Sequence, residues 1–280
     1  MKHIFLNLKR FDIPKACGGV NTLAPVKDWA ETIISGTDAA LQGEAFAGAD
    51  YVMFFPEAHL LSAAAARDGR SRIQLGCQGL HREDTAAGGN FGAFTTLLTG
   101  NAARELGCGW ALIGHCEERR EKAGVLQEAG VTDPQAVNRL LRREVLAAQR
   151  AGLRVLYCIG ESAEELPDKE RVLGSQLSVG LDGAALENVV IGYEPIWSIG
   201  PGKTPAGREA IQETARFIKA QTGGVDVVYG GGLKNDNAAM LASIPEIDGG
   251  LIALTRFSGE IGFYPGEYLA IIRRYLGIEG

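Results

Sequence analysis

The amino-acid sequence predicts an α/β fold in which eight parallel strands, with helices between them, close into a single (β/α)8 barrel. Short apolar segments alternate with helical patterns from one end of the chain to the other. There are eight such segments, the number that this closed barrel requires. At 280 residues, 46% of them hydrophobic, the chain can build one large core, and no low-complexity stretch or linker divides it. We therefore expect one domain over residues 1–280, with an open, doubly wound sheet as the alternative.

The expected strands and helices follow one another in barrel order. Each strand is a short apolar run of the kind that is buried on both faces of a parallel sheet; these runs cover residues 4–7, 51–55, 73–77, 110–113, 155–159, 189–193, 225–229 and 251–253. Asp133, followed by proline at the first position, predicts a helix over residues 134–151, and Thr204 predicts one over residues 205–221. Residues 79–90 and 121–132 are rich in glycine and charge, so we expect two surface loops.

Composition excludes several classes of protein and of site. The net charge of −6 and a pI near 5.4 argue against a nucleic-acid partner, because phosphate backbones require clustered Lys and Arg. No apolar run approaches the roughly 20 residues that span a bilayer, and Met1 leads directly into the first expected strand, so we expect a cytoplasmic protein with no membrane partner. The five cysteines form no CxxC pair and the four histidines show no ligand spacing, so we expect neither a disulfide framework nor a metal site.

Polar side chains collect at the predicted carboxyl ends of the strands, where barrels of this class carry their active sites. Asn7 and Lys9 follow the first strand, and their spacing of two points both side chains the same way on an extended backbone. His115 follows the fourth strand and Glu194 the sixth. A carboxylate buried there is costly unless it is used or paired. These four residues are therefore the candidate catalytic groups.

The segment after Glu194 has the pattern of a hinged lid. Pro195 stiffens the chain directly after the carboxylate, and Gly200, Pro201 and Gly202 form a second flexible or kinked point.

Three segments of the sequence resemble the triosephosphate isomerase family. They are YEPIWSIGPGKT at residues 193–204, LIGHCEERR at residues 112–120, and LNLKR at residues 6–10. They occur in the family's order, and the resemblance covers nearly the whole chain. It implies a TIM barrel that interconverts dihydroxyacetone phosphate and D-glyceraldehyde 3-phosphate through an enediolate, without a cofactor. It also implies a homodimer in which the loop after the third strand docks into the partner.

The resemblance implies a role for each candidate catalytic group. Glu194 would be the base that moves a proton between adjacent carbons, and His115 would be a neutral electrophile that shuttles protons between the two oxygens. Lys9 would stabilise the developing negative charge, and Asn7 would hydrogen-bond the same region. Taken alone, a histidine at a strand end is more often part of a core, and a lysine just after a strand is more often a solvated cap.

Supporting residues can be expected around this group. Glu117 resembles the family's acid that pairs with the lysine and positions it, although the neighbouring Glu118 leaves the choice between the two glutamates open. Tyr193, directly before Glu194, is expected to support the base.

The substrate phosphate is expected to bind backbone N–H groups of glycine-rich turns. The resemblance places Gly200 in the lid and Gly232 in the turn after strand seven, where the family usually has a serine. After strand eight, Ala253 and Leu254 stand in place of the family's glycine pair, and the N–H of Leu254 could still reach a phosphate. Arg256 either adds a bidentate phosphate contact or begins a surface loop.

Two other functions remain open. The altered turn after strand eight and the long loops favour, as an alternative, an isomerase of a four-carbon sugar phosphate such as erythrulose phosphate, with the same Glu and His chemistry. The third hypothesis is a barrel that binds a phosphorylated ligand without turnover, although such a binder needs no base beneath a lid.

Overall fold

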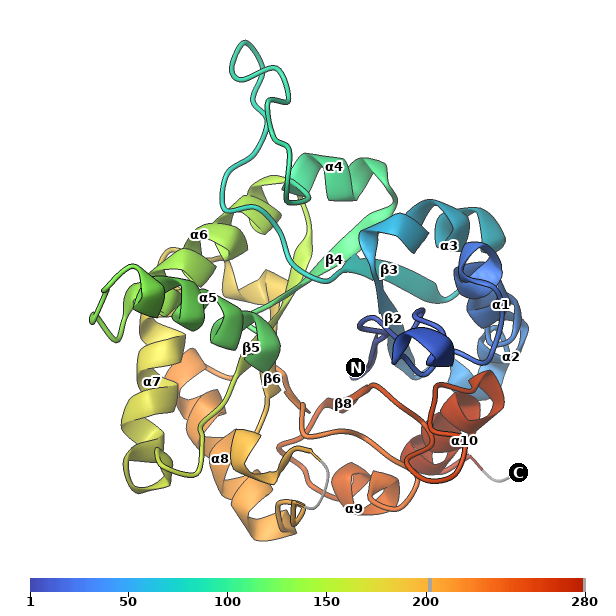
Figure 1. The fold of residues 1–280 in the computed structure, drawn as a ribbon. Helices are drawn as coiled ribbons and strands as arrows, with labels where there is room; N and C mark the ends of the chain where they lie inside the picture. Colours follow the sequence, from blue (N-terminus) through green and yellow to red (C-terminus); the bar gives the residue numbers. More distant parts are fainter. Residues whose placement is uncertain (201–202, 279–280) are drawn as a thin grey trace.

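The computed structural model describes residues 1–200 and 203–278. Within these residues, eight strands form a closed parallel barrel in which each strand is hydrogen-bonded to the next and β1 closes on β8 (Figure 1). The strands are β1 (Lys2–Asn7), β2 (Ala49–Phe55), β3 (Ile73–Cys77), β4 (Cys108–Ile113), β5 (Arg154–Ile159), β6 (Val189–Tyr193), β7 (Val227–Tyr229) and β8 (Gly249–Ile252). The predicted barrel is confirmed, and the pairing of β1 with β8 excludes the open sheet.

Six of the eight strands begin at a residue other than the predicted one: β1, β2 and β4 begin two residues earlier and β5 one residue earlier, and the last two strands also differ. β7 begins at Val227 rather than at residue 225, and β8 begins at Gly249 and ends at Ile252, rather than covering residues 251–253. The start of β8 was missed because Gly249 and Gly250 lack the apolar side chains that mark a strand. Gly249 pairs with His3 of β1, and a Cβ at Gly249 would lie 1.8 Å from the carbonyl oxygen of His3. The two backbones therefore approach too closely there for a side chain.

The barrel interior is filled by side chains that alternate along the strands. Phe5, Phe54 and Trp110 meet inside it, and the ring centroids of Phe5 and Trp110 are 5.2 Å apart. Gly76 of β3 makes room for this cluster, because a Cβ there would lie 2.3 Å from the ring of Phe54. A second and larger core packs the strands against the helices. The interior is thus solid, and it supports the strand ends from below.

Helices surround the barrel (Figure 1). They are α1 (Trp29–Ser35), α2 (Asp38–Leu41), α3 (Leu60–Ala66), α4 (Gly100–Glu105), α5 (Cys116–Glu128), α6 (Ala136–Arg150), α7 (Lys169–Gly180), α8 (Arg208–Thr222), α9 (Ala238–Ala242) and α10 (Pro265–Leu276). The helix predicted over residues 134–151 is confirmed as α6. The helix predicted from Thr204 begins only at Arg208, because the chain is still extended at Gly207, where ψ is 159°. No helix in the described residues is long and apolar enough to cross a bilayer.

One of the two expected loops is largely helical. Residues 121–128 continue α5, so the prediction of a loop over residues 121–132 was wrong for most of its length. Glu117 and Glu118 in the first turn favour the positive end of this helix, and the side chain of His115 caps it. Lys122 then joins Glu118, four residues earlier, to Glu144 of α6, at 3.2 and 2.8 Å. One of the charges that suggested a loop, that of Lys122, therefore anchors a helix.

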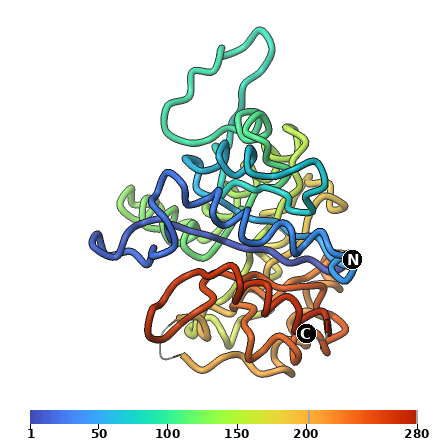
Figure 2. Tube along the Cα trace, turned by 90° about the vertical axis from the view of Figure 1, so that its right-hand side faces the viewer, coloured from blue at the N-terminus to red at the C-terminus, as the bar shows by residue number. Residues whose placement is uncertain are grey.

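The other expected loop is confirmed and is longer than predicted. The described chain forms no helix or strand from residue 78 to residue 99, and this projecting loop stands away from the barrel in both views (Figures 1 and 2). Its base is fixed by Asp84, whose carboxylate accepts the backbone N–H of Asn101 at 2.9 Å. It carries Phe91, which is 94% exposed.

Candidate active site

The four candidate catalytic residues lie together at the carboxyl end of the barrel. Asn7 is the last residue of β1, His115 follows β4 and Glu194 follows β6. All three are buried, while Lys9 is partly exposed above them. Parallel strands in a closed barrel all present their carboxyl ends on one face, so the chain order brings distant residues to one place.

His115 and Glu194 face each other directly. Nε2 of His115 lies 3.2 Å from Oε1 of Glu194, and Oε2 of Glu194 accepts the backbone N–H of Cys116 at 2.9 Å. Nδ1 of His115 accepts the backbone N–H of Glu117 at 3.2 Å, as the cap of α5. Because Nδ1 is an acceptor, we assign the ring proton to Nε2, which points at the carboxylate.

Burial shifts the pKa values of these two groups in opposite directions. It raises the pKa of Glu194 to about 8, although the N–H of Cys116 and the charge of Lys9 act the other way. It lowers the pKa of His115 to about 4, and the positive charge of Lys9 acts in the same direction. The histidine is therefore uncharged at neutral pH, and the carboxyl group titrates close to neutrality. Such values suit a neutral proton donor and a general base.

The backbone of Lys9 is held in a left-handed conformation, with φ of 40°, which non-glycine residues seldom adopt. Oδ1 of Asn7 accepts the backbone N–H of Lys9 at 3.1 Å. The side-chain amide of Gln78 donates to three acceptors around this turn: Oδ1 of Asn7 and the carbonyl oxygens of Lys9 and Phe54, at 3.1 to 3.3 Å. Gln78 was not predicted as a site residue, because nothing in the sequence reveals that its amide reaches the first strand.

The structure distinguishes the two glutamates after His115. Oε1 of Glu117 lies 2.7 Å from Nζ of Lys9, so Glu117 is the glutamate that pairs with the lysine. Glu118 points elsewhere: its Oε2 accepts the N–H of Gly114 at 2.6 Å, and its carboxylate also pairs with Lys122. Glu118 therefore fixes the turn that carries His115 and does not contact the lysine.

Comparison with known proteins identifies the family of this chain. The family model described as triosephosphate isomerase matches residues 26–262. The chain is 37% identical over 216 residues to triosephosphate isomerase of Synechococcus sp. (strain JA-2-3B'a(2-13)), which covers 76% of each chain. The chain belongs to the triosephosphate isomerase family. It is also 35% identical over 236 residues to triosephosphate isomerase of Pelodictyon phaeoclathratiforme, covering 80% of this chain and 86% of the relative.

A solved structure extends the similarity to the part of the chain before residue 26. The crystal structure of triosephosphate isomerase from Bartonella henselae matches with a TM-score of 0.71 and 26% identity, and the match covers 98% of both chains. The protein is therefore an isomerase-family enzyme with the TIM barrel fold. Asn7 and Lys9 lie outside the residues that the family model matches, so their placement rests on the geometry of β1 and on this structural match.

In this member of the family, the segment after Glu194 is tied to the barrel through a buried glutamate. Oε1 of Glu161 accepts the hydroxyl of Tyr193 and the indole N–H of Trp197, both at 2.9 Å. Tyr193 thus supports the segment that follows the base rather than the carboxylate of the base itself. Glu161 was missed by the sequence analysis. Of the predicted hinge, Gly200 has a φ of 116°, whereas Pro201 and Gly202 lie outside the described residues.

The expected phosphate residues lie in turns at the same face. Gly232 follows β7 with a φ of 97°, and Ala253 and Leu254 directly follow β8. Arg256 is engaged elsewhere: its guanidinium forms an ion pair with Glu267 of α10, and its Cζ lies 4.0 Å from the ring centroid of Tyr264. A phosphate contact from Arg256 would require this pairing to break.

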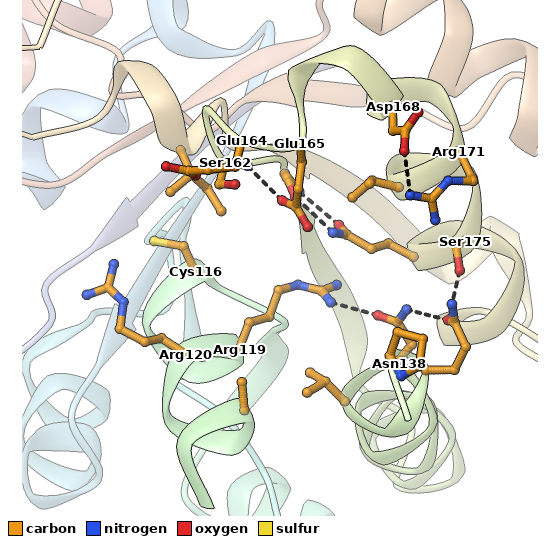
Figure 3. Close-up of a pocket in the computed structure, with 18 residues that line it drawn as sticks. Cys116, Arg119, Arg120, Asn138, Ser162, Glu164, Glu165, Asp168, Arg171 and Ser175 are labelled. Atoms are coloured by element: carbon orange, nitrogen blue, oxygen red, sulfur yellow. Dashed lines mark hydrogen bonds and ion pairs between the residues drawn. The ribbon is translucent and has the colours of Figure 1, made fainter. Parts of the chain in front are cut away.

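Two cavities flank the candidate catalytic residues: one of about 540 Å³ is lined by Asn7, Lys9 and His115, and one of about 660 Å³ lies between α5, α6 and α7 (Figure 3). Cys116 and Ile196 form the part of its wall next to Glu194. Arg119 crosses the wall and donates to the carbonyl oxygen of Gly114 at 2.8 Å, to that of Cys158 at 2.9 Å, and to Oδ1 of Asn138 at 2.9 Å. Arg119 was not predicted as a site residue, yet it binds the carbonyl oxygen of Gly114, directly before His115.

One cluster has donor atoms of the kind that bind metals. Ligand atoms of His115, Cys116 and Glu194 all lie within 4.8 Å of one another. Both ring nitrogens of His115 are already used, however, by the N–H of Glu117 and by Glu194. Burial, together with the negative charge of Glu194, also raises the pKa of Cys116 to about 12, which opposes formation of a thiolate ligand. The cluster is better suited to proton transfer than to metal binding.

Proposed function

We propose that the chain interconverts dihydroxyacetone phosphate and D-glyceraldehyde 3-phosphate through an enediolate. The observation that carries this proposal is the pair formed by Glu194 and His115. A buried carboxyl group with a raised pKa lies 3.2 Å from Nε2 of a histidine whose pKa is low enough to keep it neutral. Moving a proton between adjacent carbons needs a base at the carbons and a proton donor at the oxygens. Membership of the triosephosphate isomerase family supports the same chemistry.

The proposed steps conserve every proton. Glu194 takes a proton from the carbon next to the carbonyl, and His115 gives its Nε2 proton to the carbonyl oxygen. His115 then recovers a proton from the neighbouring hydroxyl, and Glu194 returns its proton to the other carbon. Lys9 and Asn7 would stabilise the negative charge that develops on the oxygens between these steps.

The test is isomerisation of glyceraldehyde 3-phosphate and of erythrulose phosphate, measured side by side. We expect turnover of the triose phosphate, and Glu194→Gln should lower kcat by roughly 10²- to 10⁴-fold, because a positioned base contributes about that much. Glu164→Gln is the matched control, since it removes an exposed acid from the wall of the neighbouring cavity. Equal activity of Glu194→Gln and the wild type would refute the assignment of the base.

The four-carbon substrate is the second candidate, and two observations favour it. Ala253 and Leu254 give the turn after β8 side chains next to the expected phosphate, and the cavity of about 540 Å³ lined by Asn7, Lys9 and His115 leaves room for a longer substrate. Turnover of erythrulose phosphate alone would establish it. If neither sugar reacts and solvent deuterium does not enter either of them, the hypothesis of a barrel that binds a phosphorylated ligand without turnover is the one left standing.

We also propose that the protein forms a homodimer through the projecting loop. Phe91 of this loop is 94% exposed and Leu97 is 53% exposed. The cavity of about 540 Å³ that Asn7, Lys9 and His115 line is also lined by Phe11 and Val20, and this apolar side of it could receive such side chains from a second copy. A dimer mass at micromolar concentration that falls to the monomer mass in Phe91→Asp, but not in the control Leu166→Asp, would support this. A wild-type monomer would contradict it.

A further inference from the structure

The turn after β7 holds one lysine in a defined position. The side chain of Asn237 forms two hydrogen bonds with this turn. Its amide donates to the carbonyl oxygen of Gly232 at 2.9 Å, and its Oδ1 accepts the backbone N–H of Lys234 at 2.8 Å. Gly232 itself has a φ of 97°, a conformation that side chains disfavour. The direction in which Lys234 leaves the backbone is therefore fixed.

The side chain of Lys234 fills the space beside Gly232. Its Cε lies 3.3 Å from the position that a Cβ on Gly232 would occupy. Its Nζ lies 4.2 Å from the ring centroid of Phe257, which belongs to the loop after β8. Since a ring face attracts a cation, this contact holds the ammonium between the turn after β7 and the loop after β8. These are two of the segments to which we assign the substrate phosphate.

The surroundings of this ammonium favour an anion. Among the described residues, no carboxylate lies within 4.0 Å of Nζ of Lys234, in contrast to Arg256, which is neutralised by Glu267. The backbone N–H groups of Gly232 and Leu254 donate no hydrogen bond to any other described residue. The two turns thus combine free N–H groups with one uncompensated positive charge, and Gly232 has no side-chain donor of its own.

We propose that Lys234 is a specificity-determining residue that binds the phosphate group of the substrate. Its ammonium supplies the side-chain donor that Gly232 lacks, and Phe257 holds it in place. This inference rests on the proposed function, because it assigns a ligand to the phosphate end of the same site. A charge-assisted hydrogen bond to phosphate is among the strong ones, so its loss should weaken the binding of phosphorylated ligands rather than the chemical step.

The experiment compares Lys234→Met, which keeps the apolar stem, with Lys234→Arg, which keeps the charge. For each we measure KM and kcat with glyceraldehyde 3-phosphate and the inhibition constant of inorganic phosphate. Lys27→Met is the control, since this substitution removes the same charge from a lysine side chain that is 81% exposed. We expect Lys234→Met to raise KM and the phosphate inhibition constant about tenfold with kcat within about twofold of the wild type. Lys234→Arg should keep most of the phosphate affinity, and Phe257→Leu should give an intermediate loss.

The outcomes separate this inference from the proposed function. If the wild type turns over the triose phosphate and Lys234→Met has the same KM and phosphate inhibition constant, the role of Lys234 is refuted and the isomerase stands. An equal loss in Lys27→Met would also refute it, because the effect would then be one of net charge. If the wild type does not turn over the triose phosphate, the proposed function itself fails.

Discussion

Arg119→Lys should destabilise the protein strongly although it preserves the charge. The guanidinium of Arg119 reaches four different partners, and two of them are the carbonyl oxygens of Gly114 and Cys158. A lysine ammonium is a single point and cannot reproduce this planar arrangement of donors. At least two buried acceptors should therefore lose their hydrogen bonds in the variant.

The size of the effect follows from these lost contacts. A buried acceptor left unpaired costs about 1–3 kcal/mol, so we expect a loss of about 2–5 kcal/mol in the free energy of unfolding. For a domain of this size, each kcal/mol lowers Tm by roughly 2–4 °C. Gly114 is also the residue before His115, so release of its carbonyl should loosen the histidine. A displacement of about 1 Å at a catalytic group can cost about 100-fold in rate.

Thermal unfolding and steady-state kinetics test both parts of this prediction. Tm is measured for the wild type, for Arg119→Lys and for the control Arg120→Lys, in which the same substitution is made at the next, exposed position. Kinetics are measured well below the lowest Tm, so that only folded protein contributes. A Tm of Arg119→Lys within 1 °C of the control would refute the reasoning, because it would mean that the carbonyl oxygens do not depend on this side chain.

Three further predictions concern the base and its supports. Burial raises the pKa of Glu194 to about 8, and the base must be ionised to act, so kcat/KM should rise with pH with a midpoint near 8. His115 should add no inflection near pH 6.5, because its pKa is about 4. A midpoint near pH 5 would contradict this prediction. The raised pKa of Glu194 also means that its contribution to stability is present below about pH 4.5 and is lost as pH rises through about 8. Glu194→Gln should therefore gain stability relative to the wild type between pH 5 and pH 9 in denaturant titrations, and a constant difference would count against it. Trp197→Phe removes one of the two hydrogen bonds to Oε1 of the buried Glu161, so it should lower the free energy of unfolding by about 1–3 kcal/mol, and an unchanged denaturation midpoint would disprove this.

The sequence was informative where an element is defined by its own residues. The apolar runs predicted the barrel, because a strand buried on both faces needs such a run whatever its neighbours are. The same rule failed at β8, where Gly249 is required by the close approach of β1, a contact that no local pattern reveals. It failed again at residues 121–128, where Lys122, one of the charges that resembled a loop, pairs with the buried Glu144 of α6.

The residues of the candidate site also divide into those that a local sequence pattern predicts and those that it does not. Asn7, His115 and Glu194 could be predicted because each lies at or just after the end of an apolar strand, and the barrel brings the strand ends together. Gln78, Glu161 and Arg119 could not, because each acts through contacts with residues far away in the chain.

The supporting residues explain why the catalytic pair can keep its unusual protonation states. A buried carboxyl group could lower its pKa by turning toward Lys9 or toward solvent, and a buried imidazole could raise its pKa by moving closer to Glu117, whose Oε2 lies 3.8 Å from Nδ1 of His115. Neither movement is available while the N–H groups of Cys116 and Glu117 hold Glu194 and His115 from the first turn of α5. That turn is itself held by Glu118, which accepts the backbone N–H of Gly114, and by Arg119, which donates to the carbonyl oxygen of Gly114. The pKa values therefore depend on the rigidity of one helix start, and loosening it should move both toward their ordinary values before the fold is lost.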